Sequence, residues 1–156
     1  MVTLKSSINE TNILFDKIRL FFDKLISKKQ NLRGLVIGRV ATQIATVLRG
    51  KNRVDFFPNL DLGNYVVLTN AQHLVFTGQK LNNKYYYNHS GYPGGLRKRS
   101  AKTMLNNYPT ELTKRVIKGM MPHTRLSRQQ LKRLFIYSGN THSHQAQEKN
   151  FITIKI

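Results

Sequence analysis

The side chains of this 156-residue chain offer little for acid–base or metal catalysis. Its 7 Asp and Glu residues are dispersed, and their spacing supports no carboxylate pair for proton transfer or for two metal ions. Cysteine is absent from the sequence, which excludes disulfides, thiolate metal sites and cysteine nucleophiles together. We therefore predict a protein that is not an enzyme, with no catalytic residue, no metal and no cofactor.

A glycine-rich loop that runs into three cations is the most informative motif. It reads His89-Ser90-Gly91-Tyr92-Pro93-Gly94-Gly95-Leu96 and is followed by Arg97-Lys98-Arg99. Glycines let a backbone approach phosphates closely, Tyr92 offers a face for stacking on a base or ribose, and the cations supply countercharge. The loop lacks both the G-x-G-x-x-G order and a Lys-Ser or Lys-Thr pair at Walker spacing, which argues against a mononucleotide pocket or another small-molecule substrate.

The charge balance also favours a polyanionic partner. Lys and Arg total 26 against 7 acids, a formal net charge of +19, and self-repulsion of this size opposes compaction unless a partner supplies negative charge. A membrane is disfavoured because the longest apolar runs, such as 65–68, are far too short to span one. The densest acid-poor stretch runs from Lys80 to Arg133, where Glu111 is the single acid, as expected for a surface that follows nucleic acid.

Two further groups of cations could contact phosphates. Helical spacing places Arg125, Arg128 and Lys132 on one face, and no acid lies between residues 113 and 147 to pair with them. Arg49 and Lys51 cluster at the C-terminal end of a predicted helix, where they suit the macrodipole or reach an external anion. Both uses remain open.

Two histidines come nearest to a metal-binding motif. His142 and His144 flank Ser143, so an extended backbone would point both rings to the same side. Cysteine is absent and the nearest acid is Glu148. Contact with RNA, or packing of the tail, is therefore favoured over a metal site.

Strands separated by helices predict an α/β fold with one core domain over residues 18–139, an N-terminal arm over 1–17 and a polar tail over 140–156. Residues 18–23 fit either part of an amphipathic helix or a short first strand. Alternation in the aromatic segment 84–88 predicts that at least one of its tyrosines is half-buried. The remaining predicted elements are helices at 36–48, 100–106, 109–121 and 127–133, and strands at 65–70, 74–77 and 134–137.

Four segments in order resemble the universal large-subunit ribosomal protein L13 family, over residues 36–147. The matching residues are Gly38-Arg39-Val40-Ala41 with Ile44-Ala45 and Leu48-Arg49-Gly50-Lys51; Gly63-Asn64-Tyr65-Val66-Val67 with Asn70-Ala71; His89 to Leu96; and Lys118-Gly119-Met120-Met121-Pro122 with Arg128, Leu131-Lys132-Arg133-Leu134, Tyr137-Ser138-Gly139, His142, His144, Ala146 and Gln147. Each match is modest alone. Their order over more than a hundred residues is hard to obtain by chance.

This resemblance implies a three-layer α/β/α domain on a small, mainly parallel four-stranded sheet, with basic loops and an extended C-terminal tail. It implies a structural constituent of the large ribosomal subunit that binds and organises large-subunit rRNA, joins assembly early and contacts neighbouring large-subunit proteins. A non-ribosomal RNA-binding or mRNA-regulatory protein is the alternative. The candidate RNA-binding residues are Arg39, Arg49, Lys51, His89, Ser90, Gly91, Tyr92, Gly94, Gly95, Arg97, Lys98, Arg99, Lys118, Arg125, Arg128, Lys132, Arg133, His142 and His144.

The chain departs from the family at several positions. The Trp that opens the family's first strand is missing, and either Asp23 or the Asn31-Leu32 pair takes the place of the Asp-Ala that follows it. The second choice makes residues 1–26 an added arm. Ser143 stands where the family usually has proline, and Met121 where it has a smaller aliphatic residue. With a composition typical of AT-rich coding, these departures favour a mitochondrial ribosome, with a plastid or the bacterial cytoplasm as alternatives.

Overall fold

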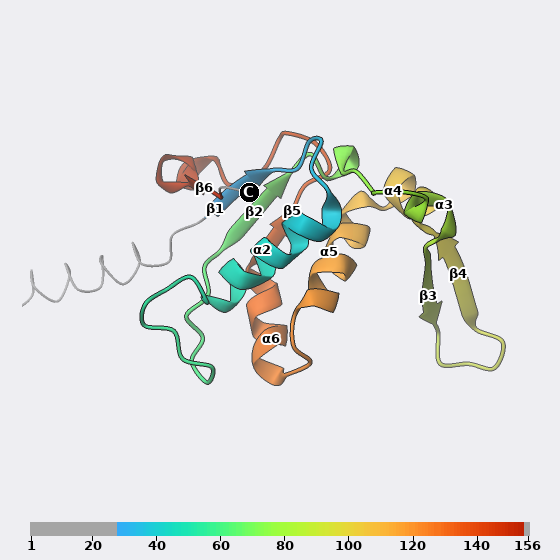
Figure 1. Cartoon of the computed structure of the whole chain (residues 1–156), viewed down its shortest axis with the longest axis horizontal. Helices are drawn as coiled ribbons and strands as arrows, with labels where there is room; N and C mark the ends of the chain where they lie inside the picture. The colour runs from blue at the N-terminus through green and yellow to red at the C-terminus, as the bar shows by residue number, and fades with distance from the viewer. Residues whose placement is uncertain (1–27, 155–156) are drawn as a thin grey trace, which may run out of the picture.

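A computed structural model describes residues 28–154 and places an α/β body beside a projecting hairpin (Figure 1). The elements, in chain order, are β1 (Lys28–Asn31), α2 (Ile37–Arg49), β2 (Val66–Thr69), the 3-10 turn η1 (Ala71–His73), α3 (Lys80–Asn83), β3 (Tyr85–His89), β4 (Leu96–Ser100), α4 (Ala101–Asn107), α5 (Pro109–Met120), α6 (Arg125–Gln130), the 3-10 turn η2 (Leu131–Arg133), β5 (Leu134–Ile136), the 3-10 segment η3 (Gln145–Asn150) and β6 (Ile152–Thr153).

A four-stranded parallel sheet organises the body. Its order is β5-β2-β1-β6, and all three neighbouring pairs are parallel. Parallel neighbours need crossover connections, which α2 supplies between β1 and β2, and α4 to α6 supply between β2 and β5. All four residues of β2, which lies between two other strands, are buried. The predicted α/β class with a mainly parallel four-stranded sheet is confirmed.

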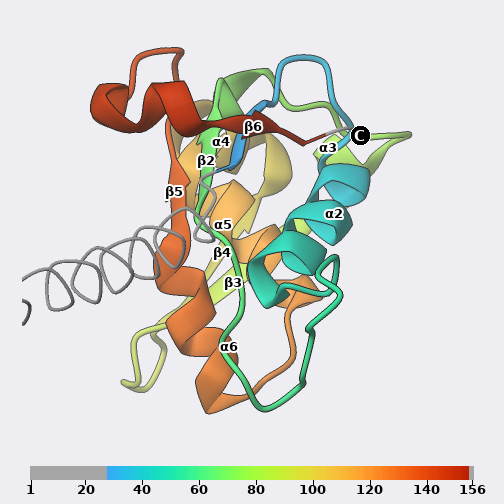
Figure 2. The ribbon, with the colours of Figure 1, turned by 90° about the vertical axis from the view of Figure 1, so that its left-hand side faces the viewer.

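The main core lies between the sheet and two helices, α2 and α5, that pack side by side (Figure 2). The apolar stripe of α2 is buried at i, i+3 and i+4 spacing, as its sequence predicts. Gly50 ends the helix in the left-handed region, with φ 78°, where glycine carries no Cβ penalty. Leu134 and Ile136 of β5 contribute to the same core, so alternation directs Phe135 and Tyr137 to the opposite face.

Two elements differ from the sequence predictions, and a third decides between alternatives that the sequence leaves open. The predicted strand 74–77 makes only a single bridge, between Val75 and Val36, because the preceding turn η1 leads the chain toward the loop before α2 instead of into the sheet. The first strand is β1 at Lys28–Asn31, which agrees with the alternative that places Asn31-Leu32 at this point; residues 18–23 lie outside the described residues. The second difference lies in the tail.

The C-terminal segment completes the sheet. β6 pairs with β1, and Ile154 is buried in the main core, although the sequence predicts only a polar tail there. We expect Ile154→Ala to lower the free energy of unfolding by about 2 kcal/mol, because it leaves a cavity in the core. Ile152→Ala, at a half-exposed position of the same strand, should cost less than about 1 kcal/mol. Equal unfolding midpoints in urea for the two variants would contradict this placement.

Candidate RNA-binding surface

The glycine loop is the tip of an antiparallel hairpin that projects from the body (Figure 1). β3 and β4 pair from Tyr85 with Ser100 to His89 with Leu96. Gly91 and Gly94 have φ of 93° and 71°, values that residues with a Cβ rarely adopt. Gly95 donates its N–H to the Tyr92 carbonyl, and the Gly91 N–H is donated to His89 Nδ1. These two hydrogen bonds hold the turn in a defined shape, and Tyr92 on this turn is 76% exposed.

The three cations after the loop lie on β4 and differ in their surroundings. Arg97 is exposed. Lys98 Nζ lies 3.9 Å from the centroid of the Tyr85 ring, and the Arg99 guanidinium lies 4.8 Å from that of Tyr108. The sequence predicts that these cations lie at the exit of a loop, but in the structure they are residues of a strand. Alternation along that strand directs Lys98 to one face and its two neighbours to the other.

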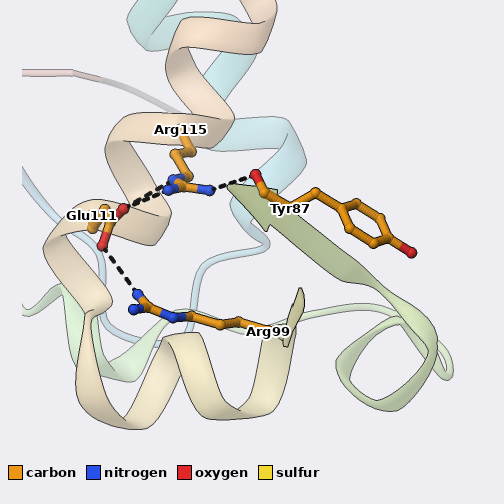
Figure 3. A network of polar contacts seen from close by, with 4 residues as sticks. All are labelled: Tyr87, Arg99, Glu111 and Arg115. Carbon is orange, nitrogen blue, oxygen red and sulfur yellow. Dashed lines mark hydrogen bonds and ion pairs between the residues drawn. The ribbon is translucent and has the colours of Figure 1, made fainter. Parts of the chain in front are cut away.

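Glu111 anchors the base of the hairpin to α5 (Figure 3). Its carboxylate accepts two hydrogen bonds from Arg115, at 2.7 and 3.0 Å, and lies 3.9 Å from Arg99 of β4. Arg115 in turn donates to the Tyr87 carbonyl of β3 at 3.4 Å. Arg115 is not among the candidate residues predicted from the sequence, although its i, i+4 spacing from Glu111 is a signal for an ion pair. Figure 3 shows the Tyr87 ring directed away from this network.

A second group of cations lies on α6 and η2. Arg125, Arg128 and Lys132 are exposed, as the predicted basic face requires. Arg133 differs from them, because its guanidinium donates at 2.6 Å both to Asp61 and to the Gly63 carbonyl, and its side chain is only 18% exposed. It therefore joins η2 to the loop that follows α2.

This role of Arg133 predicts opposite results for two neighbouring cations. Arg133→Gln should lower the free energy of unfolding by about 2 kcal/mol, because Asp61 is left partly buried without its partner, and should leave the salt dependence of RNA binding unchanged. Arg128→Gln should change stability by less than about 0.5 kcal/mol and reduce the salt slope. Both variants are measured by denaturant unfolding and by salt titration of RNA binding. If Arg133→Gln reduced the salt slope and left the free energy of unfolding unchanged, this role of Arg133 would be wrong.

The remaining candidate cations are not gathered in one place. Arg39 is exposed in the first turn of α2, about 15 Å along the helix from Arg49. Lys51 is exposed just after α2, and Lys118 is exposed in the last turn of α5. Beside Lys51, Arg53 is paired with Asp55 at 2.8 Å, and this hydrogen-bonded contact raises the pKa of Arg53.

The two tail histidines pack on the face of the sheet opposite α2 and α5. The His144 ring lies 4.6 Å from that of Phe135, and the His142 ring lies 6.1 Å from that of Phe151. Both histidines are half-buried. Of the two uses predicted for them, contact with RNA and packing of the tail, the structure therefore favours packing of the tail. Among residues 28–147 and 151–154, whose side chains the structure describes, no group of three His, Cys, Asp or Glu is placed to bind a metal. No helix among the described residues is long and apolar enough to cross a membrane.

Fold and surface together define a basic α/β protein that presents a cationic hairpin. The family model for ribosomal protein L13 matches residues 30–143, and the chain belongs to the ribosomal protein L13 family, which is structural and not enzymatic. The chain is 48% identical over 122 residues to the large ribosomal subunit protein uL13 of Ureaplasma urealyticum serovar 10, covering 78% of this chain and 82% of that protein. It is 50% identical over 119 residues to the protein of the same name from Geobacter sp. strain M21, covering 76% and 84%.

Proposed function

We propose that this protein is a structural constituent of the large ribosomal subunit, where it binds and organises large-subunit rRNA beside neighbouring proteins and joins assembly early. Membership of the ribosomal protein L13 family carries the proposal. The surface supports it, because the hairpin and α6 present cations at exposed positions with almost no nearby acid to neutralise them.

The proposed mechanism is neutralisation of phosphates by cations held in fixed positions. The Glu111 network fixes the hairpin, and the glycine turn sets the path of the RNA at its tip, where Tyr92 is free to stack on a base or ribose. Specificity then comes from the shape of folded RNA more than from reading of base edges. The proposed contacts are Arg39, Arg49, Lys51, His89, Ser90, Gly91, Tyr92, Gly94, Gly95, Arg97, Lys98, Arg99, Lys118, Arg125, Arg128 and Lys132.

Selective binding to rRNA tests this function. Purified protein should bind large-subunit rRNA more tightly than small-subunit rRNA of the same source at physiological salt, because only the former presents the matching fold. Equal affinity for both at all salt concentrations would instead favour a general RNA-binding protein.

The mitochondrial location predicted from the sequence is the finer part of the proposal. It rests on the composition and on the departures at Met121 and Ser143. The relatives reported above are bacterial, and a bacterial ribosome is equally compatible with them. Identification of the genome that encodes the chain decides between these locations.

A further inference from the structure

A groove of about 480 Å³ lies where the hairpin leaves the body, and none of the contacts proposed above uses it. Its walls come from the start of α2, residues 76–77, the first residue of α3 and the residue that follows this helix, β3, and the last turns of α5. Phe76, Tyr86 and Met120 contribute apolar and aromatic surface to it, and Met120 is 46% exposed. This size is typical of small-ligand sites, which span about 300–1,000 Å³.

The charged side chains around the groove are all cations. Lys80, Lys84 and Arg115 line it, and its lining contains no carboxylate. Arg115 is held by Glu111, whereas no acid among residues 28–154 pairs with Lys80 or Lys84. An anionic occupant with a flat apolar part therefore fits both the charge and the walls.

Two glycines leave the groove open. Gly38 of α2 and Gly119 of α5 line it, and a Cβ added to either would meet no atom within 4 Å. Neither has a positive φ. Within the described residues, the fold thus gives no steric reason for glycine at these helical positions, where alanine would be more stable.

We propose that this groove holds one unpaired nucleotide of the bound RNA, with its base against the aromatic wall and its phosphate at Lys80 and Lys84. The inference rests on the proposed function, because the RNA that follows the hairpin is what would bring a nucleotide to the hairpin's base. An unpaired base can stack on an aromatic side chain, as single-stranded RNA does on protein surfaces.

A substitution that fills the groove should weaken RNA binding without lowering the stability of the fold. Gly119→Leu places a side chain in the open space, and should keep or raise the unfolding temperature while it weakens binding to large-subunit rRNA about tenfold. Its salt slope should stay that of the wild type, because no cation is removed. Asn106→Leu adds similar bulk at an exposed site of α4 outside the groove and should bind as the wild type does. Wild-type affinity of a folded Gly119→Leu variant would overturn the proposal.

Photocrosslinking identifies the occupant in purified large subunits. With p-benzoylphenylalanine in place of Met120, we expect crosslinks to rRNA at an unpaired nucleotide. The same photoreactive residue in place of Tyr92, at the hairpin tip, tests contact with rRNA independently of the groove. If position 92 crosslinks to rRNA while position 120 crosslinks to another protein, to this chain itself or to nothing, the groove proposal fails and the proposed function stands. If neither the variant chains nor the wild type enter large subunits, the proposed function fails.

Discussion

Gly63→Ala should be the most destabilising single methyl addition in this protein, with a loss of about 3 kcal/mol in the free energy of unfolding. A Cβ at Gly63 would overlap the carbonyl of Leu48, in the last turn of α2. The Leu48 carbonyl belongs to the backbone and the added Cβ is fixed to Cα, so neither can rotate away as the end of a flexible side chain could. The Gly63 carbonyl is also held by Arg133, so a shift of this loop would break that hydrogen bond. Denaturant unfolding measures the loss directly.

Gly139→Ala is the matched control for this prediction. A Cβ at Gly139 meets no atom within 4 Å, and its φ is not positive, so we expect a change of less than about 0.5 kcal/mol. If Gly63→Ala unfolded at the same denaturant concentration as Gly139→Ala, the close approach between the loop and α2 would be wrong.

Removal of two hairpin cations should give the largest effect on RNA binding. For Arg97→Gln with Lys98→Gln, we expect the slope of log affinity against log salt to flatten by roughly 1.4 to 1.8, because two phosphate contacts are lost. Arg99 is left unchanged because its contact with Glu111 helps to anchor the hairpin. Filter binding to large-subunit rRNA over a range of salt concentrations gives the slope.

A double variant with the same change in charge controls for net charge alone. Lys102→Gln with Lys114→Gln removes two exposed cations that are not among the proposed contacts. Its slope should stay close to that of the wild type. Equal flattening in both double variants would show that the hairpin has no special part in binding and that only total charge matters.

The elements that were predictable from the sequence are those with a local pattern. α2 has a continuous apolar stripe that ends at a glycine, and β2 is an uninterrupted buried run. β1 lacks such a pattern, because its sequence is KKQN and its place is set by pairing with β2 and β6. β6 was missed for a related reason: two strand residues followed by one buried isoleucine are too short a signal to separate from a polar tail.

The candidate site was predictable where charge and glycine alone define it. The turn at residues 90–95 was recognised, but the strand character of Arg97 to Arg99 was hidden by their charge. Contacts between distant residues had no local signal. Arg133 and Asp61 are 72 positions apart, so a cation predicted to bind phosphate has an intramolecular partner that only the fold reveals.

Sedimentation of the endogenous protein tests the central claim most directly. In a sucrose gradient of cell or organelle lysate at physiological salt, detected by an antibody to the chain, the protein should travel with the large ribosomal subunit and with complete ribosomes. It should be depleted from small-subunit fractions. If the protein instead stayed at the top of the gradient while other large-subunit proteins sedimented normally, its proposed place as a constituent of the large subunit would be contradicted.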